Sequence, residues 1–106
     1  MYLESGSRFN GNFSANAPQV FLNGSKFYGT VNITNGGAAN VSSSGGCYFD
    51  KEATITNYCS SPITFAMGTS AIDTFMNKVT LKNHVGTFSV NNCIAYGDVK
   101  LWNTNT

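Results

Sequence analysis

The side chains that perform acid–base or nucleophilic chemistry are scarce in this chain. His84 is the only histidine, so a Ser-His-Asp or Cys-His arrangement would have to use it. It directly follows Asn83 at an expected corner of the chain, a position typical of a solvent-exposed side chain. The sequence therefore predicts no base that activates a nucleophile.

Paired carboxylates are the second possible source of chemistry. Asp50 and Glu52 lie two positions apart and would share one face of an extended segment. Two carboxylates are the minimum for a glycoside hydrolase. Asp98 falls at the position of Glu52 in a later sequence repeat, but about 10 Å away if successive repeats stack as strands do. This spacing is too loose for a catalytic site, and we do not expect an enzyme.

The cysteines also give no recognisable site. Cys47, Cys59 and Cys93 cannot all pair with one another, and we expect small buried thiols. Cys47 and Cys93 each precede the first residue of a repeat by two positions, yet their repeats are two apart, beyond the roughly 7 Å that a disulfide allows. With one histidine and no Cys-x-x-Cys there is no zinc pattern. No metal and no cofactor are expected.

The composition predicts a polar surface with little charge. Charged residues make up 10% of the 106 residues and the net charge is +1, whereas the chain has 14 Asn, 11 Ser, 11 Thr and 11 Gly. No basic run is available to neutralise phosphates, so nucleic acid is not an expected partner. No apolar stretch approaches the roughly 18 residues of a membrane span. Near-zero net charge favours association between molecules.

The strongest pattern is an internal repeat. Five segments, near residues 9–17, 27–35, 49–57, 75–83 and 95–103, each have an apolar first residue, a turn-like position, two alternating apolar residues and an Asn. The first residues are 18, 22, 26 and 20 positions apart. Two deviations are that Asn16 comes one place early and that Lys51 and Asn77 stand where other copies have glycine.

Alternation with a period of two predicts strands with one buried face. Shorter apolar pieces at 20–22, 39–41, 63–65 and 87–90 lie between the copies, so each repeat supplies at least two strands. Glycine-rich corners separate these pieces, and no segment has a helical period. The pairs expected to be buried are Phe13/Ala15, Val31/Ile33, Ala53/Ile55, Val79/Leu81 and Val99/Leu101.

Stacked coils bury a continuous apolar face that one strand pair cannot bury alone. We therefore expect an all-β fold, a single-domain right-handed parallel β-helix of about five coils over residues 1–106. Uneven repeat lengths favour the right-handed kind. The repeated Asn would form a hydrogen-bonded ladder, and Phe9, Phe27, Phe49 and Phe75 an internal aromatic column. An antiparallel sandwich or barrel remains the alternative, because its strands recur at a similar spacing.

The copies GSRFNGNF, GSKFYGTVNITN and AYGDVKLWN resemble the coils of bactofilin-type polymer-forming proteins. They also resemble β-helical segments of bacteriophage tail fibres and bacterial surface adhesins. The resemblance covers roughly residues 6–103 and is one of coil pattern. It implies a structural or binding role and carries no catalytic residues over to this chain.

The ends and the outer surface suggest two kinds of partner. Residues 1–5 and 104–106 are too short to cover a coil, so other copies are expected to satisfy the open ends, by end-to-end stacking or in a trimeric fibre. Exposed aromatic side chains stack on carbohydrate rings or bury against another subunit, unless neighbouring loops cover them. The residues expected to form such a binding or subunit-contact surface are Tyr28, Met76, Tyr96 and Trp102.

The expected function is therefore non-enzymatic. We expect a self-associating β-solenoid subunit of a filament, fibre or scaffold. The alternative is a module of a phage tail fibre or bacterial adhesin that binds glycan or a receptor. Either role favours the cell surface, an extracellular filament or a virion over a cytoplasmic scaffold.

Overall fold

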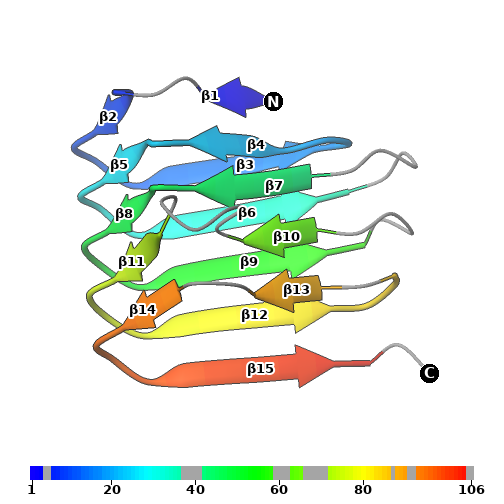
Figure 1. Cartoon of the computed structure of the whole chain (residues 1–106). Helices are drawn as coiled ribbons and strands as arrows, with labels where there is room; N and C mark the ends of the chain where they lie inside the picture. The colour runs from blue at the N-terminus through cyan, green and yellow to red at the C-terminus, as the bar shows by residue number, and fades with distance from the viewer. Residues whose placement is uncertain are drawn as a thin grey trace.

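The computed structural model describes residues 1–3, 6–36, 42–58, 63–65, 72–86, 88–90 and 93–104. These residues form fifteen short strands and no helix. The strands stack as a parallel β-solenoid in one compact domain, with the N-terminal coil at the top of Figure 1 and the C-terminal coil at the bottom.

Each coil passes through three sheets in the same order, which we call A, B and C. All three sheets are five-stranded, and every strand pairing in the described residues is parallel. Sheet A contains β1 (Tyr2–Leu3), β4 (Phe21–Asn23), β7 (Ser42–Gly45), β10 (Ile63–Phe65) and β13 (Phe88–Val90). Sheet B contains β2 (Arg8–Phe9), β5 (Lys26–Phe27), β8 (Tyr48–Phe49), β11 (Asp73–Phe75) and β14 (Cys93–Ala95). Sheet C contains β3 (Phe13–Ala17), β6 (Val31–Asn35), β9 (Ala53–Asn57), β12 (Val79–Asn83) and β15 (Val99–Asn103).

This topology confirms the expected solenoid. The alternative of an antiparallel sandwich or barrel is wrong, because strands that pair belong to successive coils and run in the same direction. Each coil has three strands, since the first residue of every repeat belongs to sheet B and the alternating pair to sheet C. The apolar piece expected at 39–41 lies outside the described residues, and β7 begins at Ser42.

The corner between sheets B and C has a constant length. Three residues connect the two sheets in every coil, at 10–12, 28–30, 50–52, 76–78 and 96–98. Gly29 lies at the middle of one such corner, where a Cβ atom would approach the carbonyl oxygen of Gly11 in the preceding coil far too closely. The uneven spacing of the sequence repeats therefore has two sources. The strands of sheet A and the connections before and after them vary in length, and β11 and β14 are one residue longer than the other strands of sheet B.

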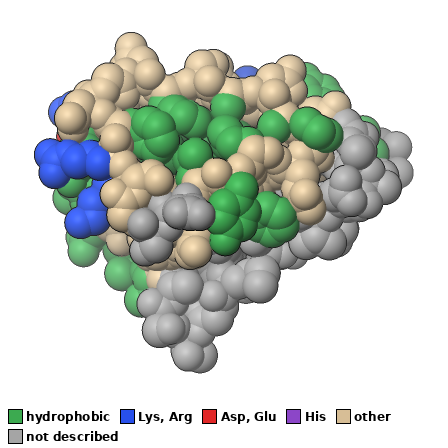
Figure 2. Space-filling view, turned by 90° about the horizontal axis from the view of Figure 1, so that it is seen from above, with side chains coloured by type: hydrophobic (Ala, Val, Ile, Leu, Met, Phe, Trp, Pro, Cys, Tyr) green, Lys and Arg blue, Asp and Glu red, His purple; other side chains and the backbone are tan. Residues whose placement is uncertain are grey.

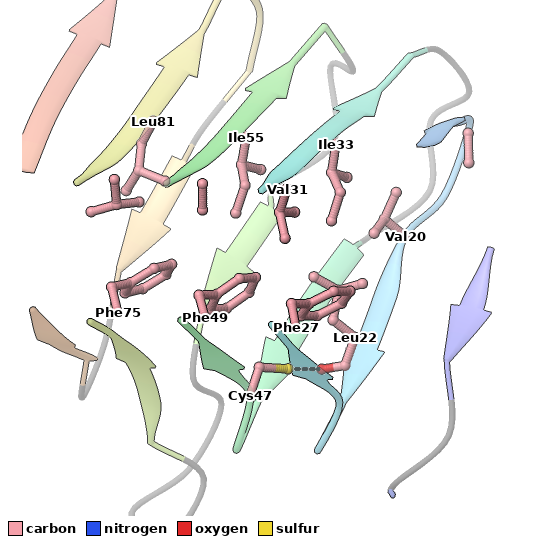
Figure 3. Packing of buried hydrophobic residues seen from close by; sticks show 13 residues of the cluster. Val20, Leu22, Phe27, Val31, Ile33, Cys47, Phe49, Ile55, Phe75 and Leu81 are labelled. Carbon is pink, nitrogen blue, oxygen red and sulfur yellow. Dashed lines mark hydrogen bonds between the residues drawn. The ribbon is translucent and has the colours of Figure 1, made fainter. Parts of the chain in front are cut away.

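The interior is filled by an aromatic column from sheet B and by mainly aliphatic columns from sheet C. Phe9, Phe27, Phe49 and Phe75 stack in sequence, with ring centroids 5.2, 5.0 and 4.7 Å apart and planes within 10° of parallel. Figure 3 shows the last three rings in a row opposite the aliphatic side chains of sheet C. This arrangement confirms the expected aromatic column, because the in-register pairing of β2, β5, β8 and β11 brings successive rings into contact.

An asparagine ladder closes the second to fifth coils at the end of sheet C. The Asn35 side-chain amide donates to Oδ1 of Asn57 at 3.0 Å, Asn57 donates to Asn83 at 2.9 Å, and Asn83 donates to Asn103 at 3.2 Å. Asn35 and Asn57 are fully buried, so these bonds satisfy polar groups inside the protein. In the first coil Ala17 pairs with Asn35, and within the described residues Oδ1 of Asn35 has no donor.

The last coil differs from the expectation. Val99 and Leu101 pair with Val79 and Leu81, which are 2% and 5% exposed, yet Val99 is 52% and Leu101 is 70% exposed. The expectation that both are buried is wrong, because β15 is the outermost strand of sheet C and no described strand lies beyond it. Apolar side chains of the interior pattern are thus presented on an open end.

Candidate functional site

Three of the four expected surface residues share one column. The residue that follows each sheet B strand donates its backbone N–H to the coil before it, as Tyr28 does to Phe9, Met76 to Phe49 and Tyr96 to Phe75. Tyr28, Met76 and Tyr96 therefore lie along the same corner of the solenoid, separated by Asp50 between the first two. Trp102 is not part of this column, because it belongs to β15 in sheet C.

Around Tyr28 the corner is polar, and neighbouring side chains contact the tyrosine ring. The Arg8 guanidinium lies 4.3 Å from the centre of the Tyr28 ring, and the Tyr48 ring lies 5.8 Å from it. The Tyr48 hydroxyl donates to Asp50 at 3.1 Å, and this hydrogen bond to the carboxylate raises the pKa of Tyr48. Tyr28 is half-buried, so it offers less free ring surface than the sequence predicts.

Toward the C-terminal end the same corner is more open. Met76 is 40% and Tyr96 is 69% exposed, and the neighbouring Ile94 on β14 is 42% exposed. The sequence repeat did not predict Ile94 as part of this surface. In the earlier coils, the position before the first residue of each repeat is polar or aromatic. Together these three side chains form an apolar strip that leads to the last coil.

Trp102 lies in a second aromatic cluster. The Lys82 ammonium is 5.2 Å and the Lys100 ammonium is 5.9 Å from the centre of its ring. His84 lies 6.3 Å from Trp102 and stacks on Tyr58, with ring centroids 4.4 Å apart and an angle of 3° between the planes. Sequence reasoning did not place Tyr58 in this cluster, although Tyr58 and His84 both directly follow the repeated Asn.

The groups considered for catalysis remain dispersed. His84 Nδ1 lies 3.0 Å from the Thr104 hydroxyl, so its close partners are a threonine and a tyrosine ring. Asp50 forms an ion pair of 3.5 Å with Lys51 on the surface. Glu52 and Asp98 take equivalent positions before β9 and β15, with Lys78 at the equivalent position between them.

Neither a metal site nor a membrane-spanning helix is found among the described residues. No group of three His, Cys, Asp or Glu side chains there has a geometry that would hold a metal ion. None of the described residues forms a helix long and apolar enough to cross a membrane.

The thiols of Cys47 and Cys93 share an interior column with a buried carboxyl. Asp73 pairs with Cys93 on one side and accepts a hydrogen bond of 2.9 Å from the backbone N–H of Cys47 on the other. The Cys47 thiol donates to the Leu22 carbonyl at 2.9 Å (Figure 3). Neither Cys47 nor Cys93 forms a disulfide, as expected, and Cys59 lies outside the described residues.

Burial controls the reactivity of these two thiols. Desolvation, followed by the nearby Asp73 charge, raises the pKa of Cys47 to about 12. The same two causes raise the pKa of the half-buried Cys93 to about 11. A reactive cysteine needs a lowered pKa, so the geometry gives the two thiols a packing role.

The C-terminal face is the remaining candidate. We use this name for the open side of the last coil, formed by β13, β14 and β15, where Val99 and Leu101 are exposed. These three strands are the outermost members of their sheets, so each presents a row of backbone N–H and C=O groups, and on β15 the exposed Val99 and Leu101 lie beside that row. Such a surface can bind another strand or another coil.

Comparison with known proteins assigns no family to the chain. No protein-family model matches it. No curated protein matches it. No solved structure matches it either, so its function has to be argued from the faces and clusters described above.

Proposed function

We propose that this protein is a non-enzymatic structural subunit that associates with further copies of itself through the ends of its solenoid, building a filament, fibre or scaffold. The observation that carries the proposal is the exposure of Val99 and Leu101 in columns whose members in the three middle coils are buried. Burying a Val or Leu side chain contributes roughly 1.5–3 kcal/mol.

The backbone of the last coil supports the same role. Sheets A, B and C all end at the C-terminal face, so a docking coil would gain hydrogen bonds from three strand edges at once. A net charge of +1 opposes such docking very little. Together these features favour stacking of further coils over a solitary domain.

End-to-end contact is favoured over lateral packing in a trimeric fibre. The outer face of sheet C presents Ser14, Asn32, Thr54, Thr80 and Lys100 along one column. Such a face is well solvated and offers little apolar area to a neighbouring solenoid. Val99 and Leu101 of β15 instead point into the interior and are exposed at the open end of the solenoid.

Electron microscopy of the purified chain at micromolar concentration tests the proposal. End-to-end stacking predicts filaments with an axial period of about 24 Å, because five coils at about 4.8 Å each make one subunit. Leu101→Lys should shorten or abolish them, since the charge would be buried at the contact. Thr54→Lys, which adds the same charge on the outer face of sheet C, should leave them intact. Monodisperse particles of the unaltered chain would contradict the proposal.

Glycan binding is the second candidate, and the Trp102 cluster supports it. A sugar ring can stack on Trp102, and the Lys82 and Lys100 ammonium groups beside it suit a carboxylate or sulfate substituent. Binding of acidic polysaccharides that is lost in Trp102→Ala, and retained in Tyr2→Ala at the other end of the chain, would favour this role. Equal binding by both variants would argue against it.

A further inference from the structure

We infer that successive copies join head to tail, so that the C-terminal face of one copy receives the N-terminal face of the next and the strand register of the three sheets continues across the contact. The N-terminal face is the open side of the first coil, formed by β1, β2 and β3. The inference rests on the proposed function and specifies its partner surface and register.

Both faces present the interior of a coil. Met1, Leu3, Phe9 and Phe13 are only partly buried and pack against the core from the first coil. Figure 2 looks down on this end and shows hydrophobic side chains gathered in its middle, with polar atoms around most of them. The N-terminal face is therefore an apolar surface of the same kind as the C-terminal face.

The two faces are complementary in side-chain size. If the register between coils continues, Ala95 meets Phe9 of the next copy, and Leu101 meets Ala15 of the next copy. A small residue thus opposes a large one at both positions. Ala95 ends the aromatic column after Phe75 within one copy. In the joined state, Phe9 of the next copy would start the column again directly after Ala95.

Strand lengths and corners match as well. β15 and β3 both have five residues, and three residues connect sheet B to sheet C in both coils. Joining two C-terminal faces would reverse the strands of one copy. The two copies would then pair in antiparallel fashion at the contact, unlike the described strand pairs within the chain, which are parallel. A head-to-tail join avoids this mismatch.

Gly11 provides an independent observation. A Cβ atom built on Gly11 has nothing within 4 Å in its own chain, so the fold of a single copy does not require glycine there. At the equivalent positions Gly29 and Gly97, a Cβ would approach the backbone of the preceding coil to 2.4 and 2.6 Å. Lys51 and Asn77 hold this position in the third and fourth coils, so a close approach is not needed in every coil. In the head-to-tail join, Gly11 of the next copy lies directly over Gly97 and leaves room for it.

A disulfide between copies tests the register. Ser7 is equivalent to Ser25, Cys47, Asp73 and Cys93 in one interior column, so Cys93 would face Ser7 of the next copy. Adjacent coils place these Cα atoms about 4.8 Å apart, within the range that a disulfide spans. In a Cys59→Ser background, Ser7→Cys should give a ladder of linked species on mild oxidation. Peptide mapping should identify links between positions 7 and 93.

Two controls keep the outcomes separate. Ser14→Cys, on the outer face of the same coil, should give no such ladder. The Cys59→Ser parent should give no dimers linked through Cys93. If the protein associates in sedimentation but forms no link between positions 7 and 93, the head-to-tail register is wrong. Dimers linked through two copies of Cys93 would also overturn this register. Self-association itself would remain supported in both cases. Absence of association at every concentration refutes the proposed function itself.

Discussion

The side-chain amide of Asn57 donates a hydrogen bond of 2.9 Å to Oδ1 of Asn83, a residue one coil further along the solenoid. Asn57 is fully buried and Asn83 is 6% exposed, so water cannot replace this bond. Asn57 and Asn83 each both donate and accept within the ladder, so removal of either one affects both of its neighbours.

Asn57→Ala should therefore destabilise the protein by roughly 2–5 kcal/mol, because it leaves buried polar groups on Asn35 and Asn83 without their partner. Urea unfolding followed by circular dichroism measures this change. Asn32→Ala, on the exposed face of β6, serves as the matched control and should change stability by less than about 0.5 kcal/mol. Equal effects of the two substitutions would contradict a structural role for the ladder.

The ladder can also be extended at its start. Ala17→Asn would place an amide donor next to Oδ1 of Asn35, the buried acceptor that no described residue satisfies. We expect a gain of about 1 kcal/mol, the usual net value of one buried hydrogen bond. The same substitution at Ser14, which points outward from β3, should give no gain. A loss of stability in Ala17→Asn would show that the first coil lacks room for the amide.

The aromatic column predicts a graded response to truncation. Phe49 is fully buried between Phe27 and Phe75, so Phe49→Ala should cost about 3–5 kcal/mol by leaving a cavity. Phe9→Ala at the open end should cost clearly less, because its ring is only half-buried. Both are best measured in a Leu101→Lys background, where association does not add to stability. A larger effect at Phe9 would be inconsistent with the column as described.

Alkaline pH should weaken the fold through Cys47. Its pKa is raised from an ordinary value of 9.0 to about 12 in the folded chain, by burial first and by Asp73 second. Between pH 9 and 12 the unfolded thiol loses its proton and the folded one keeps it. Stability therefore falls with rising pH across this window, by up to about 1.4 kcal/mol per pH unit.

Cys47→Ser isolates this contribution. Serine keeps a hydroxyl donor for the Leu22 carbonyl and does not titrate in this range, and Ser25 already occupies the same column. The free energy of unfolding of Cys47→Ser, measured from pH 8 to 10.5, should decline less steeply than that of the unaltered chain. Identical slopes would mean that Cys47 is accessible to water in the folded state.

The sequence predicted the columns well because each column is a local property repeated in every coil. Asn35, Asn57, Asn83 and Asn103 align as expected, since period-two alternation fixes which side chains point inward. Asn16 was harder to interpret, and the register shows that it points outward while Ala17 takes the ladder position. One residue of shift reverses the side of a strand, so a single repeat with an early Asn is ambiguous.

Contacts between outward-pointing side chains could not be predicted in the same way. Tyr58 and His84 hold equivalent positions in adjacent coils, and Lys82 pairs with Trp102. The stacking of the two rings and the approach of the lysines to Trp102 depend on the direction in which these side chains lean. The exposure of Val99 and Leu101 also required the structure, because the same alternation in 79–83 produces buried side chains. Period-two alternation predicts whether a side chain points inward or outward. The position of its coil in the solenoid decides whether another coil covers that side chain.

The constant corner between sheets B and C has a consequence for variation of this fold. Three residues make that corner in all five coils, whereas the connections from sheet C to sheet A have three, six, five and four residues without any change in register along sheet C. Insertions and grafted loops are therefore tolerated on the sheet A side and excluded from the corner between B and C. New recognition sequences can accumulate on one edge of the rod while its axial architecture remains unaltered.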